Sequence, residues 1–223
     1  MSVGRALCIG VDTSESQSAL AAADARALAE VARRQGFEPA ALLLDVAATR
    51  ANVCEKLREA ASACAAGDLF MLPFSGHGGR KACAGVDARE AFHGIWVLFD
   101  GSFDDSEMRT ALAAFKPGVR VLVISDSCNG GVPGHVPVAP VAAVSASVLV
   151  LSACGQEQFA DAAGLPGHFT TALLRTWHRG RRIFSYRAFY EMIVEAMPAY
   201  QQPKYYWLGA QDSRFEAQVP FTV

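Results

Sequence analysis

The sequence has no run of about 18 consecutive apolar residues, the length that a membrane-spanning helix requires. It also has no marked excess of one charge, since 20 Lys and Arg residues against 22 Asp and Glu residues leave a formal net charge of -2. We therefore expect neither a membrane nor a nucleic acid as partner. The N-terminal apolar run Ala6–Val11 is too short for a signal peptide, so we expect a cytoplasmic protein.

The six cysteines form no CxxC pair and no other pair with zinc-finger spacing. A zinc site drawn from Cys128, Cys154, His135 and His168 would lack the tight local ligand pairs of structural zinc, so we expect reduced thiols and no metal requirement. The glycine-rich stretch Gly76–Gly79 fits neither the P-loop nor the dinucleotide-binding pattern, which argues against a nucleotide cofactor.

A chain of 223 residues with 52% hydrophobic residues can bury a sizeable core, and we treat residues 1–223 as one domain. Apolar runs typical of buried strands alternate with stretches of helical periodicity. The expected strands are Arg5–Asp12, Ala40–Asp45, Leu69–Ser75, Gly94–Asp100, Val119–Ser125, Val148–Cys154 and Tyr205–Leu208. The expected helices are Ser18–Gly36, Thr49–Cys64, Met108–Phe115, Phe169–Arg179 and Tyr186–Tyr200. This order predicts an α/β fold with a mostly parallel sheet of about six strands, helices on both faces and a ligand site at the carboxyl ends of the strands.

Reactive side chains flanked by glycines follow two of the expected strands. His77 comes shortly after Leu69–Ser75, and Cys128 comes shortly after Val119–Ser125. A thiolate nucleophile served by a His that accepts and returns a proton is a common arrangement in cysteine hydrolases. The backbone N–H groups of Gly78 and Cys128 are candidates for an oxyanion hole.

Three segments resemble motifs of caspase-like peptidases. FSGHGG (Phe74–Gly79) resembles their histidine motif, SDSCNGG (Ser125–Gly131) resembles the nucleophile motif of metacaspases and bacterial orthocaspases, and LSACGQEQFAD (Leu151–Asp161) resembles a small-subunit segment of these proteins. His77 and Cys128 are 51 residues apart, similar to the separation of about 50 in caspases.

This resemblance covers nearly the whole chain and implies a caspase–hemoglobinase fold with cysteine endopeptidase activity. It implies that Cys128 is the nucleophile and that His77 is the general base and acid. It also divides the chain into a large-subunit-like part over residues 1–131, a linker over residues 132–147 and a small-subunit-like part over residues 148–223.

The resemblance further places Asp126, Ser75 and Asp100 in the S1 pocket, which receives the side chain before the cleaved bond. Carboxylates in such a pocket favour a cationic partner, above all the guanidinium of Arg. The segment Asp12–Ser18 has no Arg, whereas caspases use arginines to select Asp. The expected substrate is therefore a peptide or protein with Arg or Lys at the cleaved position.

Calcium activation, self-processing and oligomeric state stay open from the sequence. Many metacaspases carry an acidic calcium loop, but the matching stretch Arg80–His93 holds only Asp87 and Glu90 as acids. No cofactor is therefore expected to be required. The linker Val132–Ser147 contains neither Lys nor Arg, so an enzyme of basic specificity could cut itself only elsewhere, at Arg80, Lys81 or Arg89.

Two other functions fit parts of the pattern. The first is a catalytically idle caspase-like module that binds a partner, because a fold does not fix a function. The second is another hydrolase with a Cys nucleophile, which is disfavoured because Asp126 stands where the G-x-[SC]-x-G nucleophile elbow needs Gly. Selective alkylation of Cys128 would separate an enzyme from the idle module.

Overall fold

Six apolar segments form the central sheet in the computed structural model, which describes residues 2–12, 20–82, 92–127, 143–153, 167–178, 184–199 and 201–223. The strand order is β2-β1-β3-β7-β8-β9. The strands are β1 (Gly4–Val11), β2 (Ala41–Leu44), β3 (Leu69–Gly76), β7 (Arg120–Asp126), β8 (Ser147–Ser152) and β9 (Lys204–Gly209). All neighbours are parallel except β8 and β9. The predicted α/β sheet is confirmed, and its last strand runs antiparallel.

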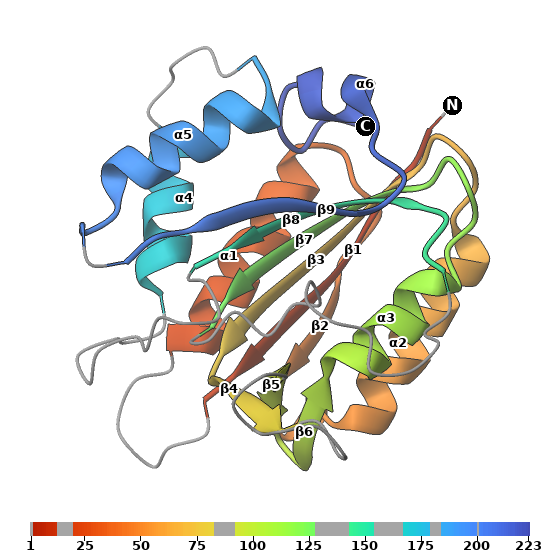
Figure 1. Cartoon of the computed structure of the whole chain (residues 1–223), viewed down its shortest axis with the longest axis vertical. Helices are drawn as coiled ribbons and strands as arrows, with labels where there is room; N and C mark the ends of the chain where they lie inside the picture. The colour runs from red at the N-terminus through yellow and green to blue at the C-terminus, as the bar shows by residue number, and fades with distance from the viewer. Residues whose placement is uncertain are drawn as a thin grey trace.

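Helices cover both faces of this sheet (Figure 1). Helices α2 (Arg50–Ala63) and α3 (Asp105–Ala113) pack on one face, together with the 3₁₀ turn η1 (Asp45–Ala47). The other face carries α1 (Leu20–Arg34), α4 (His168–His178), α5 (Tyr186–Ala196) and the short α6 (Ser213–Ala217). Strand side chains alternate between the two cores, as the twofold periodicity of a strand requires. We call these layers the α2 face and the α1 face.

The expected strand Gly94–Asp100 does not join the central sheet. It forms most of β5 (Phe92–Leu98), which pairs antiparallel with β4 (Gly78–Ala82) and β6 (Gly101–Asp104) in a separate three-stranded sheet. The apolar run alone does not show which sheet receives it. The expected helix Tyr186–Tyr200 also ends early, at Ala196, because Pro198 disfavours helical backbone before it.

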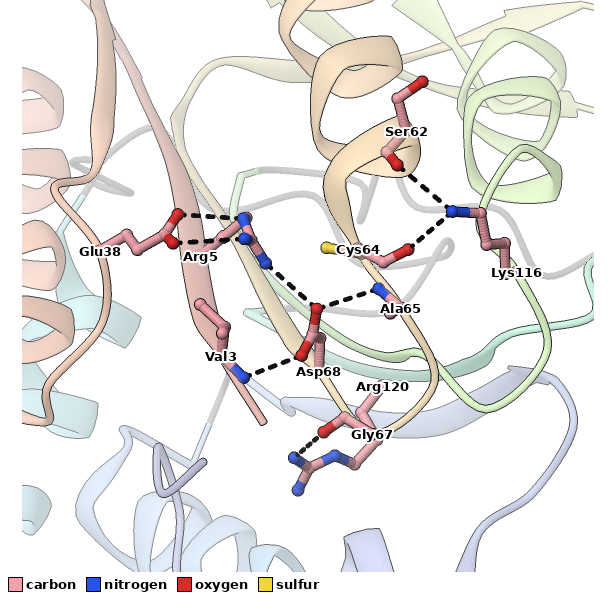
Figure 2. A network of polar contacts seen from close by, with 10 residues as sticks. All are labelled: Val3, Arg5, Glu38, Ser62, Cys64, Ala65, Gly67, Asp68, Lys116 and Arg120. Carbon is pink, nitrogen blue, oxygen red and sulfur yellow. Dashed lines mark hydrogen bonds and ion pairs between the residues drawn. The ribbon is translucent and has the colours of Figure 1, made fainter. Parts of the chain in front are cut away.

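The amino-terminal edge of the sheet is fixed by a polar network around Asp68, the residue before β3 (Figure 2). The Asp68 carboxylate accepts hydrogen bonds from the backbone N–H groups of Val3 (2.8 Å) and Ala65 (2.9 Å) and from the Arg5 guanidinium (3.1 Å). Burial opposes ionisation, yet these donors hold the pKa of Asp68 below its ordinary value. This network ties the start of β1 to the start of β3.

Within the described part of the chain, no helix has the length and apolar character needed to cross a membrane.

Candidate active site

His77 directly follows β3 and is exposed at the carboxyl edge of the sheet. Its carbonyl oxygen accepts a hydrogen bond of 2.9 Å from the backbone N–H of Val97 in β5. Gly76 precedes it, and a Cβ atom there would lie 2.9 Å from the carbonyl oxygen of Val11. The close approach of β1 therefore requires glycine at this position, and it brings the end of β1 against the histidine.

Cys128 lies outside the described residues, which end at Ser127 on this side of the gap. The register of β3 and β7 pairs Ser75 with Asp126. His77 and Cys128 each stand two positions further along the sequence from these partners. The two strands that lead to the expected dyad are therefore adjacent, parallel and level with each other.

Gly78 opens β4 opposite Trp96 of β5. Hydrogen-bonded and non-hydrogen-bonded pairs alternate along an antiparallel ladder. Because Val97 donates to His77, the pair of Gly78 and Trp96 falls at a non-hydrogen-bonded position. The Gly78 N–H accordingly points away from β5.

Ser75 lies on the α1 face, where it contacts an acid that the sequence analysis did not single out. Its hydroxyl donates a hydrogen bond of 2.8 Å to Oδ2 of Asp24 in α1. Burial raises the pKa of Asp24 to about 7; the Ser75 hydrogen bond opposes this shift, and the charges of Asp126 and Asp12 add to it. A signal was present, because Asp24 falls on the buried stripe of α1, three residues after Ala21 and four before Leu28.

Asp126 is also on the α1 face and only 4% exposed. Its Oδ2 accepts a hydrogen bond of 2.8 Å from the backbone N–H of Thr170, and the N–H of Gly167 also donates to the carboxylate. Burial raises its pKa, while these donors at the start of α4 oppose the shift. Asp126 thus anchors α4 to the end of the nucleophile strand.

Gly167 separates the two acids. Its φ is +105°, and a Cβ atom at this position would lie 3.3 Å from Oδ2 of Asp24. Glycine therefore lets the start of α4 pass between Asp24 and Asp126. Asp12, at the end of β1, completes the acidic group and accepts hydrogen bonds of 3.2 Å from the N–H groups of Ala21 and Ala22 at the start of α1.

Asp100, the third expected S1 residue, is not brought to this group. It is exposed in the turn between β5 and β6, and its Oδ1 accepts a hydrogen bond of 2.8 Å from the backbone N–H of Arg50. That bond caps the start of α2, on the α2 face of the sheet. The structure thus gives Asp100 a contact at the start of α2, and its place in the S1 pocket stays a prediction.

A cavity of about 530 Å³ opens beside Asp24 between α1, α4 and α5. Its charged and polar lining includes Asp24, His168, Arg175 and Glu195. Of the acidic group, Asp24 thus borders open space.

Possible metal ligands and free thiols can be located only among the residues that the structure describes. Within those residues, no group of three or more His, Cys, Asp and Glu side chains could hold a metal ion. The acids of the expected calcium loop, Asp87 and Glu90, fall outside them. Cys8 and Cys64 are buried free thiols, and Cys54 is an exposed one.

Comparison with known proteins places this geometry in a family. The sequence matches the family described as "Caspase domain" over residues 3–217. The crystal structure of GSU0716 from Geobacter sulfurreducens is similar, with 33% identity, a TM-score of 0.84 and coverage of 99% of each chain. The Drosophila initiator caspase Dronc shares the fold at 13% identity, with a TM-score of 0.62 over 99% of this chain and 82% of its own.

Metacaspase-1B of Aspergillus fumigatus is 31% identical over 94 residues. The matched stretch covers 40% of this chain and only 23% of that relative, so the similarity concerns a part of the metacaspase. The family match, in contrast, spans nearly all of this chain, and the caspase Dronc shares its fold. The chain therefore belongs to the caspase-domain family of cysteine peptidases.

Proposed function

We propose that the chain is an active cysteine endopeptidase of the metacaspase or orthocaspase type that cleaves after Arg or Lys. One observation carries the proposal. Ser75 and Asp126 are register partners at the ends of β3 and β7, and these strands lead directly to His77 and Cys128. A specificity pocket and a catalytic dyad would then share one edge of the sheet.

In the first half of the proposed reaction, His77 accepts the proton of the Cys128 thiol, and the thiolate attacks the peptide carbonyl carbon. The N–H groups of Gly78 and Cys128 stabilise the negative oxygen of the tetrahedral intermediate. His77 then donates its proton to the leaving amine, the C–N bond breaks, and a thioester remains on Cys128. The orientation of the Gly78 N–H away from β5 supports this assignment.

In the second half, His77 takes a proton from a water molecule, which attacks the thioester carbonyl. A second tetrahedral intermediate collapses to the carboxylic acid product and the thiolate, which recovers its proton. No metal or cofactor enters these steps, so calcium would act, if it acts, on the shape of the site.

The acidic group supports basic specificity. Asp24 with Ser75, and the buried Asp126 beside them, concentrate negative charge on the α1 face next to the dyad positions. Two carboxyl groups close together resist being ionised at the same time, because their negative charges repel each other. A cationic substrate side chain bound between them offsets this repulsion. We assign the S1 pocket to Ser75, Asp126 and Asp24, with Asp24 in the place that Asp100 was expected to take.

Fluorogenic peptides test this function. The wild-type protein should release the fluorophore from peptides with Arg or Lys before the cleaved bond and not from those with Asp. Cys128→Ala and His77→Ala should remove the activity while they leave the circular dichroism spectrum unchanged. A folded wild-type protein that turns over none of these peptides would favour the idle binding module.

A further inference from the structure

Trp96 of β5 is fully buried beneath the edge that carries the proposed dyad. Its ring stacks on Phe74 of β3, with centroids 4.3 Å apart and planes 5° from parallel. Phe74 is the register partner of Ser125 in β7. The indole therefore spans the two strands that lead to His77 and Cys128.

The indole N–H begins a chain of hydrogen bonds toward the nucleophile. It donates to Oγ of Ser125 at 3.1 Å, and the hydroxyls of Ser125 and Ser127 lie 2.9 Å apart in a hydrogen bond that either can donate. Both serines are buried: Ser125 is 0% exposed and Ser127 is 4% exposed. Ser127 is bonded covalently to Cys128.

The same strand also holds the histidine. Val97, next to Trp96, donates its backbone N–H to the carbonyl oxygen of His77 at 2.9 Å. One short segment of β5 is thereby linked to the backbone of the proposed base and to the residue before the proposed nucleophile. Among the described residues, its link to Ser127 runs through the indole N–H of Trp96 and the hydroxyl of Ser125.

We propose that Trp96 is a positioning residue, whose indole N–H fixes Ser127 and thereby sets the backbone entering Cys128 at a constant place relative to His77. This inference rests on the proposed dyad. A core position needs only apolar volume, which Phe would also supply. The indole adds one polar group, which is unfavourable to bury without a partner, and its partner here is the hydroxyl that leads to Ser127.

Trp96→Phe removes this N–H and keeps an aromatic ring against Phe74. Trp177→Phe is the matched control, because it makes the same substitution in the core of the α1 face. The Trp177 ring makes edge contacts there with Phe189 and Phe221, at centroid distances of 6.2 Å and 5.0 Å. The measurements are kcat and KM on an Arg peptide and the pH profile of Cys128 alkylation by iodoacetamide, followed by mass spectrometry. The second readout does not depend on turnover.

Misplacement of a catalytic group by about 1 Å can reduce rates about a hundredfold. We expect Trp96→Phe to lower kcat about tenfold to a hundredfold with KM changed less than about twofold, and to move the alkylation profile to higher pH. Trp177→Phe should lower thermal stability and leave both readouts as in wild type. Ser127→Ala should reproduce the Trp96→Phe effect, and the double variant should be no worse than either single one.

Wild-type values of kcat and of the alkylation profile in Trp96→Phe overturn the inference and leave the dyad intact. If Trp96→Phe does not fold, Ser127→Ala decides, because it leaves the aromatic stack in place; unchanged kinetics in that variant overturn the inference as well. A wild-type protein without turnover and without a fast-reacting Cys128 overturns the dyad, and this inference with it.

Discussion

The hydroxyl of Ser75 donates a hydrogen bond of 2.8 Å to Oδ2 of Asp24, and so joins the end of β3 to the first turns of α1. This contact brings an acid from a helix surface to the side of the residue that stands two positions before His77. It forms the base of the proposed pocket for a basic substrate side chain.

The pH dependence of substrate binding follows from this acid. Burial raises the pKa of Asp24 to about 7, so the carboxyl group becomes ionised as the pH passes through neutrality. A cationic side chain binds the ionised form better. We expect KM for an Arg peptide to fall between pH 6 and pH 8 in the wild type, and Asp24→Asn to lose that dependence; a wild-type KM that is flat or rises over this range contradicts the assignment.

The stability difference between the wild type and Asp24→Asn should depend on pH with a defined sign. The folded pKa of about 7 lies above the ordinary value of 3.8 for an Asp side chain, so between these values the native state binds more protons than the unfolded state. Stability then decreases as the pH rises through this window, because the native state must hold an unfavourable charge. Melting temperatures at pH 5 and pH 8 check this. The melting temperature of Asp24→Asn relative to wild type should be higher at pH 8 than at pH 5. The same difference at both pH values would contradict a raised pKa of Asp24.

Asp100 and Asp126 offer a test of which acid serves the pocket. Asp100→Ala removes an exposed cap of α2, and we expect a loss of about 1 kcal/mol with unchanged preference for Arg over Asp. Asp126→Ala removes the buried acceptor of the Thr170 N–H, and we expect a loss of about 1–3 kcal/mol. Urea unfolding and peptide kinetics check both; a loss of selectivity in Asp100→Ala would restore it to the pocket.

Much of this arrangement could be predicted from the sequence, and the failures have physical causes. The apolar runs Leu69–Ser75 and Val119–Ser125 predict two buried strands whose carboxyl ends lie at one edge of the sheet, and the structure shows that β3 and β7 are neighbours. Asp24 was missed because its place on the buried stripe of α1 was the one local signal, and its partner Ser75 lies 51 residues away in the sequence. The strand that ends before Asp100 was expected in the central sheet, but β5 belongs to a second sheet, and no local pattern determines which sheet a short apolar strand joins.

Thiol reactivity should single out Cys128. Burial raises the pKa of Cys8 to about 12 and also raises that of Cys64, and the exposed Cys54 has a raised pKa as well. All three are therefore poor nucleophiles at neutral pH. We expect substoichiometric iodoacetamide at pH 7 to label Cys128 first, with Cys54→Ala as control for the exposed thiol. Faster labelling of Cys54 would argue against an activated Cys128.

The active enzyme should remain one uncut chain through its linker. Residues 132–147 offer no Lys or Arg, and Arg80 and Lys81 are paired with β5 inside β4. A protease binds an extended, unpaired segment, so cleavage after either residue would first require β4 to separate. After incubation, electrophoresis should show one band for the wild type and for Cys128→Ala alike, and each protein should have the intact mass of its own uncut chain. Fragments ending at Arg80 or Lys81 in the wild type alone would show that β4 opens.

Covalent capture tests the central claim most directly, because one reagent reports the nucleophile and the specificity together. A peptide chloromethyl ketone with Arg at its reactive end should lose chloride to the thiolate and leave a thioether on Cys128. We predict stoichiometric modification of Cys128 in the wild type, much less in Asp24→Asn, and none with the corresponding Asp reagent. Modification of another cysteine, or equal capture of the Asp and Arg reagents, would contradict the account.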